Sequence, residues 1–492
     1  MPARTHRPAT EFDAVVVGAG PNGLAAAVTL ARAGLTVCVF EQSERAGGGS
    51  STAELTLPGF RHDVCSAVHP LAFESRFFRE FELRRRIDFI TPDIPFAHPL
   101  DGGRAGIAYR DLARTARALG KDGRAYRRLV GPLAARAREV ADLTGSSLLR
   151  FPPHPVTAAL FASATLEQGS PVWNARFQND AAPSMLTGVA AHAILPLPSL
   201  AAAGAGLALT AYAHAQGWPI PVGGSQSIAD AMTADLESHG GRVVTGILIN
   251  SLDELPTSRV TLLDVTPHAL LRIGGDRFPT RYALAVRRFR YGSAVAKVDF
   301  ALSQPVPWQR PELHDAGTLH LGGTRQEIAV SESEVARGRL SDSPYVLISQ
   351  PSVFDSTRAP EGAHTLWAYT HVPALDRSDR RDVVIRQIER FAPGFRDTIL
   401  ATSSATAIDV QRHNPNYPGG DIAAGTPNLA QLIRRPVVSR DPWRTPAAGV
   451  YLCSASTTPG PGVHGLAGWF AALSALRHDF GSRALPDLSI GA

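Results

Sequence analysis

Cysteine is scarce in this chain. Cys38, Cys65 and Cys453 are the only three among 492 residues, and they stand far apart without a C-x-x-C pair. A disulfide framework needs several pairs of cysteines, and dithiol redox chemistry needs two of them close together. The sequence therefore argues against both, and Cys38, which lies in an apolar run, is interpreted as a small buried residue.

Long apolar runs are missing as well. The nearest approach, Gly188–Ala213, is interrupted by Pro196 and Pro198. Because proline removes a helical hydrogen bond, the segment predicts two helical pieces joined by a proline turn rather than a membrane span. Two interpretations stay open: the core of a helical cap domain, or an apolar wall that faces a substrate or dips into lipid. The first ten residues lack a signal-peptide core, which predicts a cytoplasmic protein, with peripheral membrane contact as the alternative.

Strong charge of either sign is absent. The net charge is +5, the basic residues are scattered, and Arg84–Arg86 is their densest run. Such a run is typical of a solvated helix face, so we expect no nucleic-acid partner. With 44% hydrophobic residues over this length, the chain can bury a large core and predicts two interleaved domains.

A nucleotide-binding pattern is present in Phe12–Glu41. An apolar strand is followed by Gly18, Gly20 and Gly23 in the G-x-G-x-x-G spacing, then by a small-residue helix and a second strand. Glycines in these places allow the tight turn, the approach of backbone amides to a pyrophosphate and close packing of helix on strand. Glu41 follows Gly23 by 18 residues, where an acid that binds ribose hydroxyls is expected.

The next loop favours a flavin over a nicotinamide cofactor. Arg45, Gly47 and Gly48 follow the second strand closely, and they can offer a cation and further backbone amides to the cofactor. An Arg-x-Gly-Gly segment after the first motif resembles the pattern of FAD-binding flavoproteins of the two-dinucleotide-binding-domain type. No second G-x-G-x-x-G occurs, which favours a redox cycle on flavin alone with O2 or a quinone as electron acceptor.

Two later segments complete the expected cofactor site. A helix over 227–238 and a β-rich run over 243–250 return the chain to the nucleotide fold, and Val244 is the expected neighbour of the adenine. Near the C-terminus, a strand over 450–454 leads through a Pro/Gly loop to a helix that begins near Gly465, whose positive end would face the flavin. The full set of expected cofactor-binding residues is Gly18, Gly20, Pro21, Gly23, Glu41, Arg45, Gly47, Gly48, Val244, Ser456, Gly462, Val463 and His464.

Five sequence blocks together resemble one family. They are GAGPNGLAAA with Glu41, ERAGGG followed by PGFRHDVCSAVHP, QPSVFDSTRAPEGAHTLWAYTHVP, NPNYPGGD and YLCSASTTPGPGVHG. This set is similar to the phytoene desaturase-like FAD-dependent oxidoreductases, in the branch of pyridine nucleotide-disulphide oxidoreductase domain-containing protein 2. The similarity runs from about Phe12 to Phe480, and it departs from the family at Gly49, where many relatives have arginine.

The resemblance implies a bound FAD and a fold like that of monoamine oxidases. The expected fold class is α/β: a Rossmann-type FAD-binding domain of the GR2 or amine-oxidase type, with an interleaved α+β substrate domain. We expect 1–75, 217–298 and 402–492 to form the FAD-binding domain, and 76–216 and 299–401 to form the substrate or cap domain. Characterised carotenoid members of the family desaturate or isomerise apolar polyenes, and desaturation can proceed by hydride transfer to flavin N5.

Function stays open between three classes. The first is an FAD-dependent dehydrogenase, desaturase or isomerase of an apolar, carotenoid- or lipid-like substrate, the second is an amine oxidase, and the third is a flavin-bearing interaction protein without catalysis. His69 is the one candidate catalytic base, since imidazole titrates near neutral pH, with a structural histidine as the alternative. No metal site is expected. Partners left open are the apolar substrate, the electron acceptor, a membrane surface and a second copy of the chain.

Overall fold

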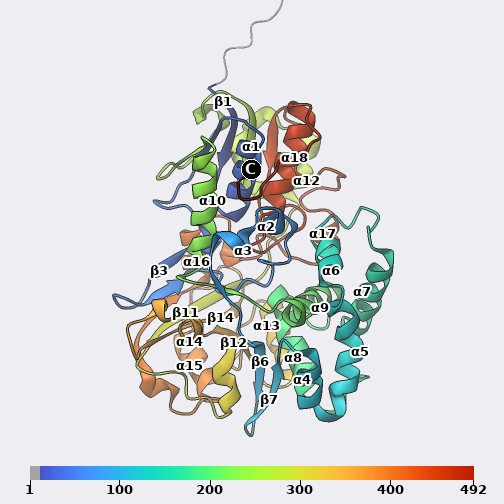
Figure 1. Cartoon of the computed structure of the whole chain (residues 1–492), viewed down its shortest axis with the longest axis vertical. Coiled ribbons are helices and arrows are strands. Elements are labelled where there is room, and N and C mark those ends of the chain that lie inside the picture. The colour runs from blue at the N-terminus through green and yellow to red at the C-terminus, as the bar shows by residue number, and fades with distance from the viewer. Residues whose placement is uncertain (1–10, 492) are drawn as a thin grey trace, which may run out of the picture.

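The chain folds into two halves that each contain one large β-sheet. The structure is a computed structural model, and it describes residues 11–491. Figure 1 shows one sheet with its helices in the upper part of the molecule and the other in the lower part. The first ten residues, which carried the expectation of a cytoplasmic protein, lie outside the described part.

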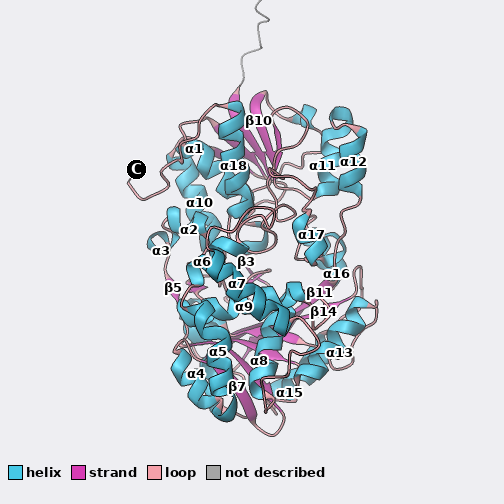
Figure 2. Cartoon of the chain, turned by 90° about the vertical axis from the view of Figure 1, so that its right-hand side faces the viewer, coloured by secondary structure: helices cyan, strands magenta, loops and turns pink. Residues whose placement is uncertain are grey.

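The upper sheet is parallel and is covered on both faces. Its strands are β1 (Phe12–Val17), β2 (Val37–Phe40), β9 (Arg242–Val244), β10 (Ser258–Leu263) and β16 (Val450–Leu452). Its helices are α1 (Pro21–Arg32), α10 (Gln226–Ser238), α11 (Pro267–Gly274), α12 (Thr280–Arg287) and α18 (Leu466–Asp479). The strand order is β16-β10-β1-β2-β9, with α1, α10 and α18 on one face and α11 and α12 on the other (Figure 2).

The strand, turn and helix predicted from the glycine pattern are present as β1, α1 and β2. A Cβ atom at Gly23 would overlap the carbonyl oxygen of Gly18, so the first turn of α1 closes only on glycine. Helix α18 lies equally close to this turn, because a Cβ atom at Gly468 would overlap the carbonyl oxygen of Asn22. The start of α1 is therefore packed from two sides by backbone.

The lower sheet has seven strands. They are β6 (Ile94–Leu100), β7 (Arg104–Ala108), β11 (Ala294–Leu302), β12 (Ala316–Leu321), β13 (Val346–Ser349), β14 (His364–Val372) and β15 (Ile399–Ala405). The order is β15-β11-β14-β13-β12-β6-β7, and β12 with β6 is the parallel pair. On β14, Leu366 and Ala368 pack toward α15 (Arg381–Glu389), while Trp367 and Tyr369 alternate to the opposite face.

Six helices form a layer beside the lower sheet. They are α4 (Leu112–Ala118), α5 (Gly123–Ala134), α6 (Ala137–Thr144), α7 (Pro155–Gln168), α8 (Ala181–Ala190) and α9 (Leu200–Ala215), with α13 (Arg325–Ala336) packed on α8. The two-helix prediction for 188–213 is confirmed, since α8 and α9 flank the stretch that contains Pro196 and Pro198. Helix α8 is buried throughout all but its first residue. Within 188–213 every residue except Pro196 is buried or half-buried, and residues of α9 line the cavity described below.

Shorter elements join the two halves. They are β3 (Thr52–Glu54), β4 (Arg61–Asp63), β5 (Phe89–Ile90), β8 (Ile220–Pro221), α2 (Arg76–Glu80), α3 (Leu83–Arg86), α14 (Pro351–Phe354), α16 (Ala407–His413) and α17 (Leu429–Ile433). β3 pairs with β4, and β5 pairs with β8. Among residues 11–491, no helix is both long enough and apolar enough to cross a bilayer.

The sheets divide the chain at slightly different places from the expected boundaries. Strand β11 lies wholly in the lower sheet, although a boundary after residue 298 would cut it. Phe77 and Phe78 of α2 belong to the core under the upper sheet, beyond the expected end at residue 75. Composition changes mark the crossings only roughly, because a strand's pattern of apolar residues does not say which sheet it will join.

A buried arginine ties the two halves together. Arg358, which follows α14, is fully buried, and its Nη2 lies 2.8 Å from Asp63 Oδ2 in β4. Its Nε lies 3.0 Å from Asp355 Oδ2, an oxygen that also accepts the backbone N–H of Gly223 just before α10. One guanidinium therefore neutralises two carboxylates that come from different parts of the fold.

We expect Arg358→Met to destabilise the protein by about 3–5 kcal/mol, because two buried carboxylates would lose their cation. Denaturation in urea, followed by circular dichroism, measures the change. Arg339→Met is the matched control, since Arg339 pairs with Glu334 on the surface and should matter little. Equal stability of the two variants would contradict the bridging role given to Arg358.

Candidate functional site

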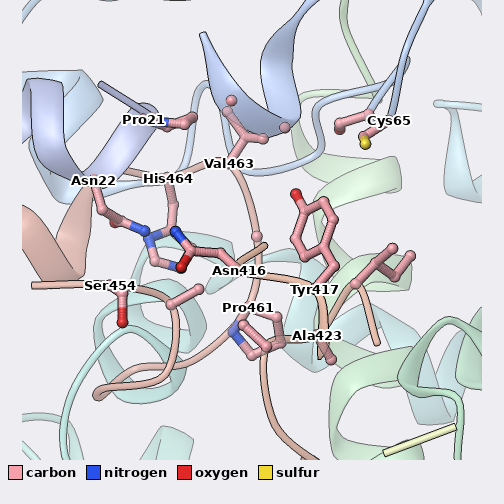
Figure 3. A pocket seen from close by; sticks show the side chains of 18 of the residues that line it. Pro21, Asn22, Cys65, Asn416, Tyr417, Ala423, Ser454, Pro461, Val463 and His464 are labelled. Carbon is pink, nitrogen blue, oxygen red and sulfur yellow. The ribbon is translucent and has the colours of Figure 1, made fainter. Parts of the chain in front are cut away.

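One large cavity lies between the two halves. Its volume is about 1260 Å³, and its walls come from the first turn of α1, the ends of the upper strands, the lower sheet and helices α7 and α9. Pockets for a single small ligand usually measure about 300–1,000 Å³. Figure 3 shows residues from three distant segments on its wall: Pro21 and Asn22, Asn416 and Tyr417, and the stretch from Ser454 to His464. The cavity thus has room for a cofactor and a second molecule.

Glu41 is held rigidly at the polar end of this cavity. Its Oε2 accepts the backbone N–H of Ala19 at 2.7 Å, and its Oε1 accepts the N–H of Ser43 at 2.9 Å. The N–H of Gly18 donates to the carbonyl of Phe40, which ties the glycine turn to the end of β2. A carboxylate fixed in this way beside a glycine turn is suited to bind hydroxyl groups of a ribose.

The loop after Glu41 closes over the glycine turn. The N–H of Gly47 donates to the carbonyl of Ala19, and a Cβ atom at Gly48 would lie 3.0 Å from the Cα of Gly20. Arg45 lines the cavity at its exposed edge, where its guanidinium lies 3.3 Å from Asp230. The two loops expected to hold a cofactor are therefore in direct backbone contact.

The structure explains the departure at Gly49. A Cβ atom there would collide with the hydroxyl oxygen of Tyr417, whose side chain also lines the cavity. Burial raises the pKa of Tyr417 well above its usual value, so the phenol stays neutral. Tyr417 lies in the NPNYPGGD block and takes the space that an arginine would need.

The expected adenine neighbour lies just outside the cavity. The carbonyl of Val244 accepts the N–H of Glu41 at 2.9 Å, which pairs β9 with the end of β2. Val244 is not among the cavity walls, whereas Ile247, Leu248 and Ile249 are. Strand β9 ends at Val244, earlier than the predicted β-rich run over 243–250, and the chain then turns toward the cavity. The apolar side chains in this segment that could contact an adenine ring are therefore those of Ile247, Leu248 and Ile249.

The C-terminal loop reaches the cavity with four expected residues. Ser456, Gly462, Val463 and His464 all line it, and α18 begins at Leu466, as predicted. His464 is saturated: its Nε2 donates to the Gly460 carbonyl at 3.1 Å, and its Nδ1 accepts the Leu466 N–H at 3.0 Å. Burial lowers the pKa of His464 to about 4. This imidazole is neutral and caps α18, so it shapes the loop rather than exchanging protons.

Asp264, which was not among the expected site residues, also faces this site. It stands just after β10, and its Oδ2 accepts the Gly23 N–H at 2.9 Å, inside the first turn of α1. Burial raises the pKa of Asp264 to about 7, and the nearby Glu41 adds to the rise, while the bond from Gly23 opposes it. A polar residue at the end of a buried parallel strand was the available signal, since ligands bind at this edge of α/β sheets.

The opposite end of the cavity is apolar. Helix α9 turns a stripe of small residues toward it, including Ala201, Gly204, Ala205 and Ala208. Trp367 and Tyr369 of β14 face it from the sheet, with their rings perpendicular and 5.1 Å apart. Among the described residues that line the cavity, the carboxylates are Glu41, Glu44 and Asp264, and all three lie at the nucleotide end. No acid therefore lines the end between the lower sheet and α9.

Lys297 is the one lysine in the wall. It lies on β11, forms an ion pair with Asp299 two residues along the strand, and stands 5.9 Å from the ring of Trp367. Burial raises the pKa of Asp299 to about 6, although Lys297 opposes the rise. His62 lies 3.5 Å from Asp299, and burial lowers its pKa to about 3. The cluster is largely self-neutralised.

Three further histidines line the cavity: His69, His192 and His413, of which His413 is exposed. The hydroxyl of Ser225 donates to the Ser66 carbonyl at 2.6 Å, so His69 Nε2 must be the donor in its 2.7 Å bond to Ser225. His69 Nδ1 then carries a lone pair, and it is buried without a partner within residues 11–491. His192 is half-buried and pairs with His320 through their Nε2 atoms at 2.8 Å. Burial lowers the pKa of His69 to about 4 and that of His192 to about 3, so both are neutral near pH 7.

Eleven of the fourteen expected residues line the cavity, His69 among them, while Gly23, Gly47 and Val244 do not. Gly23 and Gly47 act through the backbone contacts described above. Asn416, Tyr417, Trp367 and Tyr369 line it as well, and all lie in blocks that carried the family resemblance. Within residues 11–491, no three His, Cys, Asp or Glu side chains are grouped so as to hold a metal ion.

We expect Asp264→Asn to change how the stability of the cofactor-free protein depends on pH. The folded protein holds the Asp264 proton up to about pH 7, whereas an unfolded aspartate loses it near pH 4. The wild-type free energy of unfolding should therefore fall as pH rises through this window, by on the order of a few kcal/mol, and the variant should lack that fall. Urea denaturation at pH 5 and pH 8 measures it, with the exposed Asp276→Asn as control. A constant difference between Asp264→Asn and wild type would contradict the expectation.

Comparison with known proteins supports the fold. The family described as NAD(P)-binding Rossmann-like domain matches residues 16–81. Along 94% of its length the chain is 26% identical to the rat (Rattus norvegicus) protein named pyridine nucleotide-disulfide oxidoreductase domain-containing protein 2, of which 93% is covered. The protein name implied by the sequence blocks is thus found among its relatives.

Two solved structures share the whole architecture. A putrescine oxidase variant with redesigned cofactor binding superposes with a TM-score of 0.60 at 17% identity, covering 94% of this chain and 98% of the other. Reduced UDP-galactopyranose mutase gives a TM-score of 0.55 at 14% identity, covering 98% and 96%. The expected α/β fold, a Rossmann-type domain with an interleaved second domain as in amine oxidases, is confirmed.

Proposed function

We propose that this chain is an FAD-dependent oxidoreductase that dehydrogenates, desaturates or isomerises an apolar substrate of carotenoid or lipid type. The single observation behind the substrate class is the far end of the cavity, which is lined by small, aliphatic and aromatic side chains and by no carboxylate. The phytoene desaturase-like character of the sequence blocks points the same way.

The residues present fit FAD. Gly18, Gly20 and Gly48 leave backbone exposed where a pyrophosphate would lie, and Glu41 is fixed for a ribose. Asn22 Oδ1 is buried and has no hydrogen-bond partner in the described part of the chain. A bound ligand could supply that partner. When bound, FAD supplies a hydride acceptor, and O2 or a quinone would reoxidise it.

The chain's own residues then serve mainly to position and to exclude water. The Ala and Gly stripe of α9 leaves a slot against Trp367 and Tyr369, in which a flat or extended apolar molecule would be held in register. The proton that leaves the substrate needs a neutral base. His69, through Nδ1, and His192 are two imidazoles of the wall that have this capacity.

An FAD-dependent amine oxidase is the second candidate. The perpendicular pair of Trp367 and Tyr369 and the likeness to putrescine oxidase favour it. Against it, a protonated amine would find no carboxylate that lines this end of the cavity, since Asp299 is already paired with Lys297. Moving a cation from water into such a site is unfavourable, so we rank this function below the first.

We expect the purified protein to carry a flavin whose visible absorbance band is bleached, without oxygen, by polyenes or long acyl compounds and not by amines. The reason is that no carboxylate lines the apolar end of the cavity, so this end suits an uncharged ligand better than a protonated amine. The measurement is an anaerobic absorbance titration with both compound panels.

A variant that fills the apolar end is the control for this titration. Ala205→Phe puts a large side chain on the α9 stripe, far from the glycine turn, so it should prevent bleaching while leaving the flavin spectrum intact. Bleaching by amines alone would establish the oxidase instead. A protein with flavin that no compound reduces would favour the non-catalytic class, and a protein that cannot be loaded with flavin would overturn the proposal.

We expect Glu41→Gln to weaken FAD binding about 10- to 100-fold, because an amide NH2 would replace one of the two acceptors and would face a backbone N–H. Fluorescence titration of the cofactor-free protein with FAD measures this. Glu44→Gln makes the same charge change on the same cavity edge, where its carboxylate has no hydrogen bond within residues 11–491, and it should bind like wild type. Equal loss in both variants would mean that net charge, not the fixed carboxylate, governs binding.

A further inference from the structure

The mouth of the cavity is surrounded by exposed apolar side chains. Leu148, Leu166 and Leu429 line the cavity and are at the same time 47%, 60% and 44% exposed. They mark the place where the apolar end opens to the outside. Together with the other exposed apolar residues of the same two segments, 145–166 and 422–440, they form what we call the rim: Leu148, Leu149, Phe151, Val156, Leu160, Leu166, Leu429, Ile433 and Val438.

The rim is built by two elements that face the same side of the molecule. Helix α7 and the loop before it supply one part, and α17 with the residues after it supplies the other (Figure 2). The guanidinium of Arg150, in the first part, lies 5.8 Å from the ring of Trp443, just beyond the second. Phe151 is 87% exposed, which is the largest exposure of any large apolar residue among those described. A concentration of such side chains on one face is characteristic of an interaction surface.

The two segments that carry the rim contribute charge of one sign, while Glu139 and Asp142 of α6 lie beside His154 and Thr157. The segments 145–166 and 422–440 contain no Asp or Glu, and they include the exposed Arg150, Arg434 and Arg440. None of these three arginines forms an ion pair within residues 11–491. Apolar side chains flanked by unpaired cations suit the interface of a bilayer with anionic headgroups, where the former enter the acyl boundary and the latter meet phosphates.

We propose that the rim docks this protein on an anionic membrane surface, with the cavity mouth against the lipid. A second copy of the chain is a poorer occupant, because a symmetric contact would bring the same arginines together without any acid from these segments. This site is not the apolar segment 188–213, whose residues other than Pro196 are buried or half-buried. An apolar ligand would then enter the cavity without crossing water; this last step rests on the proposed function, whereas docking itself does not.

Vesicle flotation of the full-length protein tests the proposal. We expect binding to vesicles of phosphatidylcholine mixed with phosphatidylglycerol, weaker binding to phosphatidylcholine alone, and release by salt. Phe151→Gln with Val156→Gln should reduce binding about tenfold or more, since neither side chain would enter the acyl boundary. Val330→Gln with Leu340→Gln, two exposed apolar residues of α13 and the chain after it, is the matched control and should bind like wild type.

The charge is tested separately. Arg150→Gln and Arg434→Gln should each weaken binding to the anionic vesicles about fivefold and leave binding to phosphatidylcholine unchanged. Equal binding by rim and control variants would overturn the proposal. So would a rim-dependent dimer, seen by light scattering, that binds no vesicle. Because flotation needs no flavin reduction, its result is independent of whether the proposed substrate class is right.

Discussion

The first turn of α1 has no room for side chains, and much of the structure depends on that constraint. Backbone of Gly18, Gly23 and Gly48 meets there at distances that a Cβ atom would block, and α18 approaches with Gly468. Peptide N–H groups at this turn are then left for carboxylates or a ligand. Glu41 takes the N–H of Ala19 and Asp264 takes that of Gly23, so two acids at the ends of the strands on either side of β1 stabilise the turn.

This arrangement places the carboxyl group of Asp264 at the glycine turn, at the end of the cavity where an anionic ligand would bind. Asp264 accepts the N–H of Gly23 in the glycine turn, and its ionised form would repel any anion bound beside that turn. Its raised pKa relieves the conflict, because a protonated carboxyl keeps its hydrogen bond from Gly23 without opposing a phosphate. Glu41 lies at the end of β2, suited to hydroxyl groups rather than phosphates. Two acids that look alike in the sequence therefore act differently because of where each strand ends.

The sequence predicted the nucleotide half well, because its signals are local. Glycine spacing, a strand that ends in an acid and a helix that starts after a Pro/Gly loop are all set by neighbours in the chain, and β1, α1, β2 and α18 were found in that way. The strands that pair with each other are far apart in the chain, so local patterns do not reveal their pairing. The sequence does not predict that β11 joins the lower sheet or that Tyr417 fills the space beside Gly49. Asp264 was missed for the same reason, since only the fold brings it to Gly23, 241 residues away.

The lower half shows why an apolar cavity can be kept open at all. Protein interiors pack densely, so a large void needs a rigid wall that cannot collapse. Here one wall is β-sheet, in which β11 is hydrogen-bonded on both sides, to β14 and to β15. The other is α9, whose alanines and glycines remove side-chain volume without shortening the helix. Arg358 links the β3–β4 hairpin, through Asp63, to Asp355 just after α14. The small residues of α9 thus leave a cavity where larger side chains would have filled the space between helix and sheet. The cavity opens to the surface at the rim.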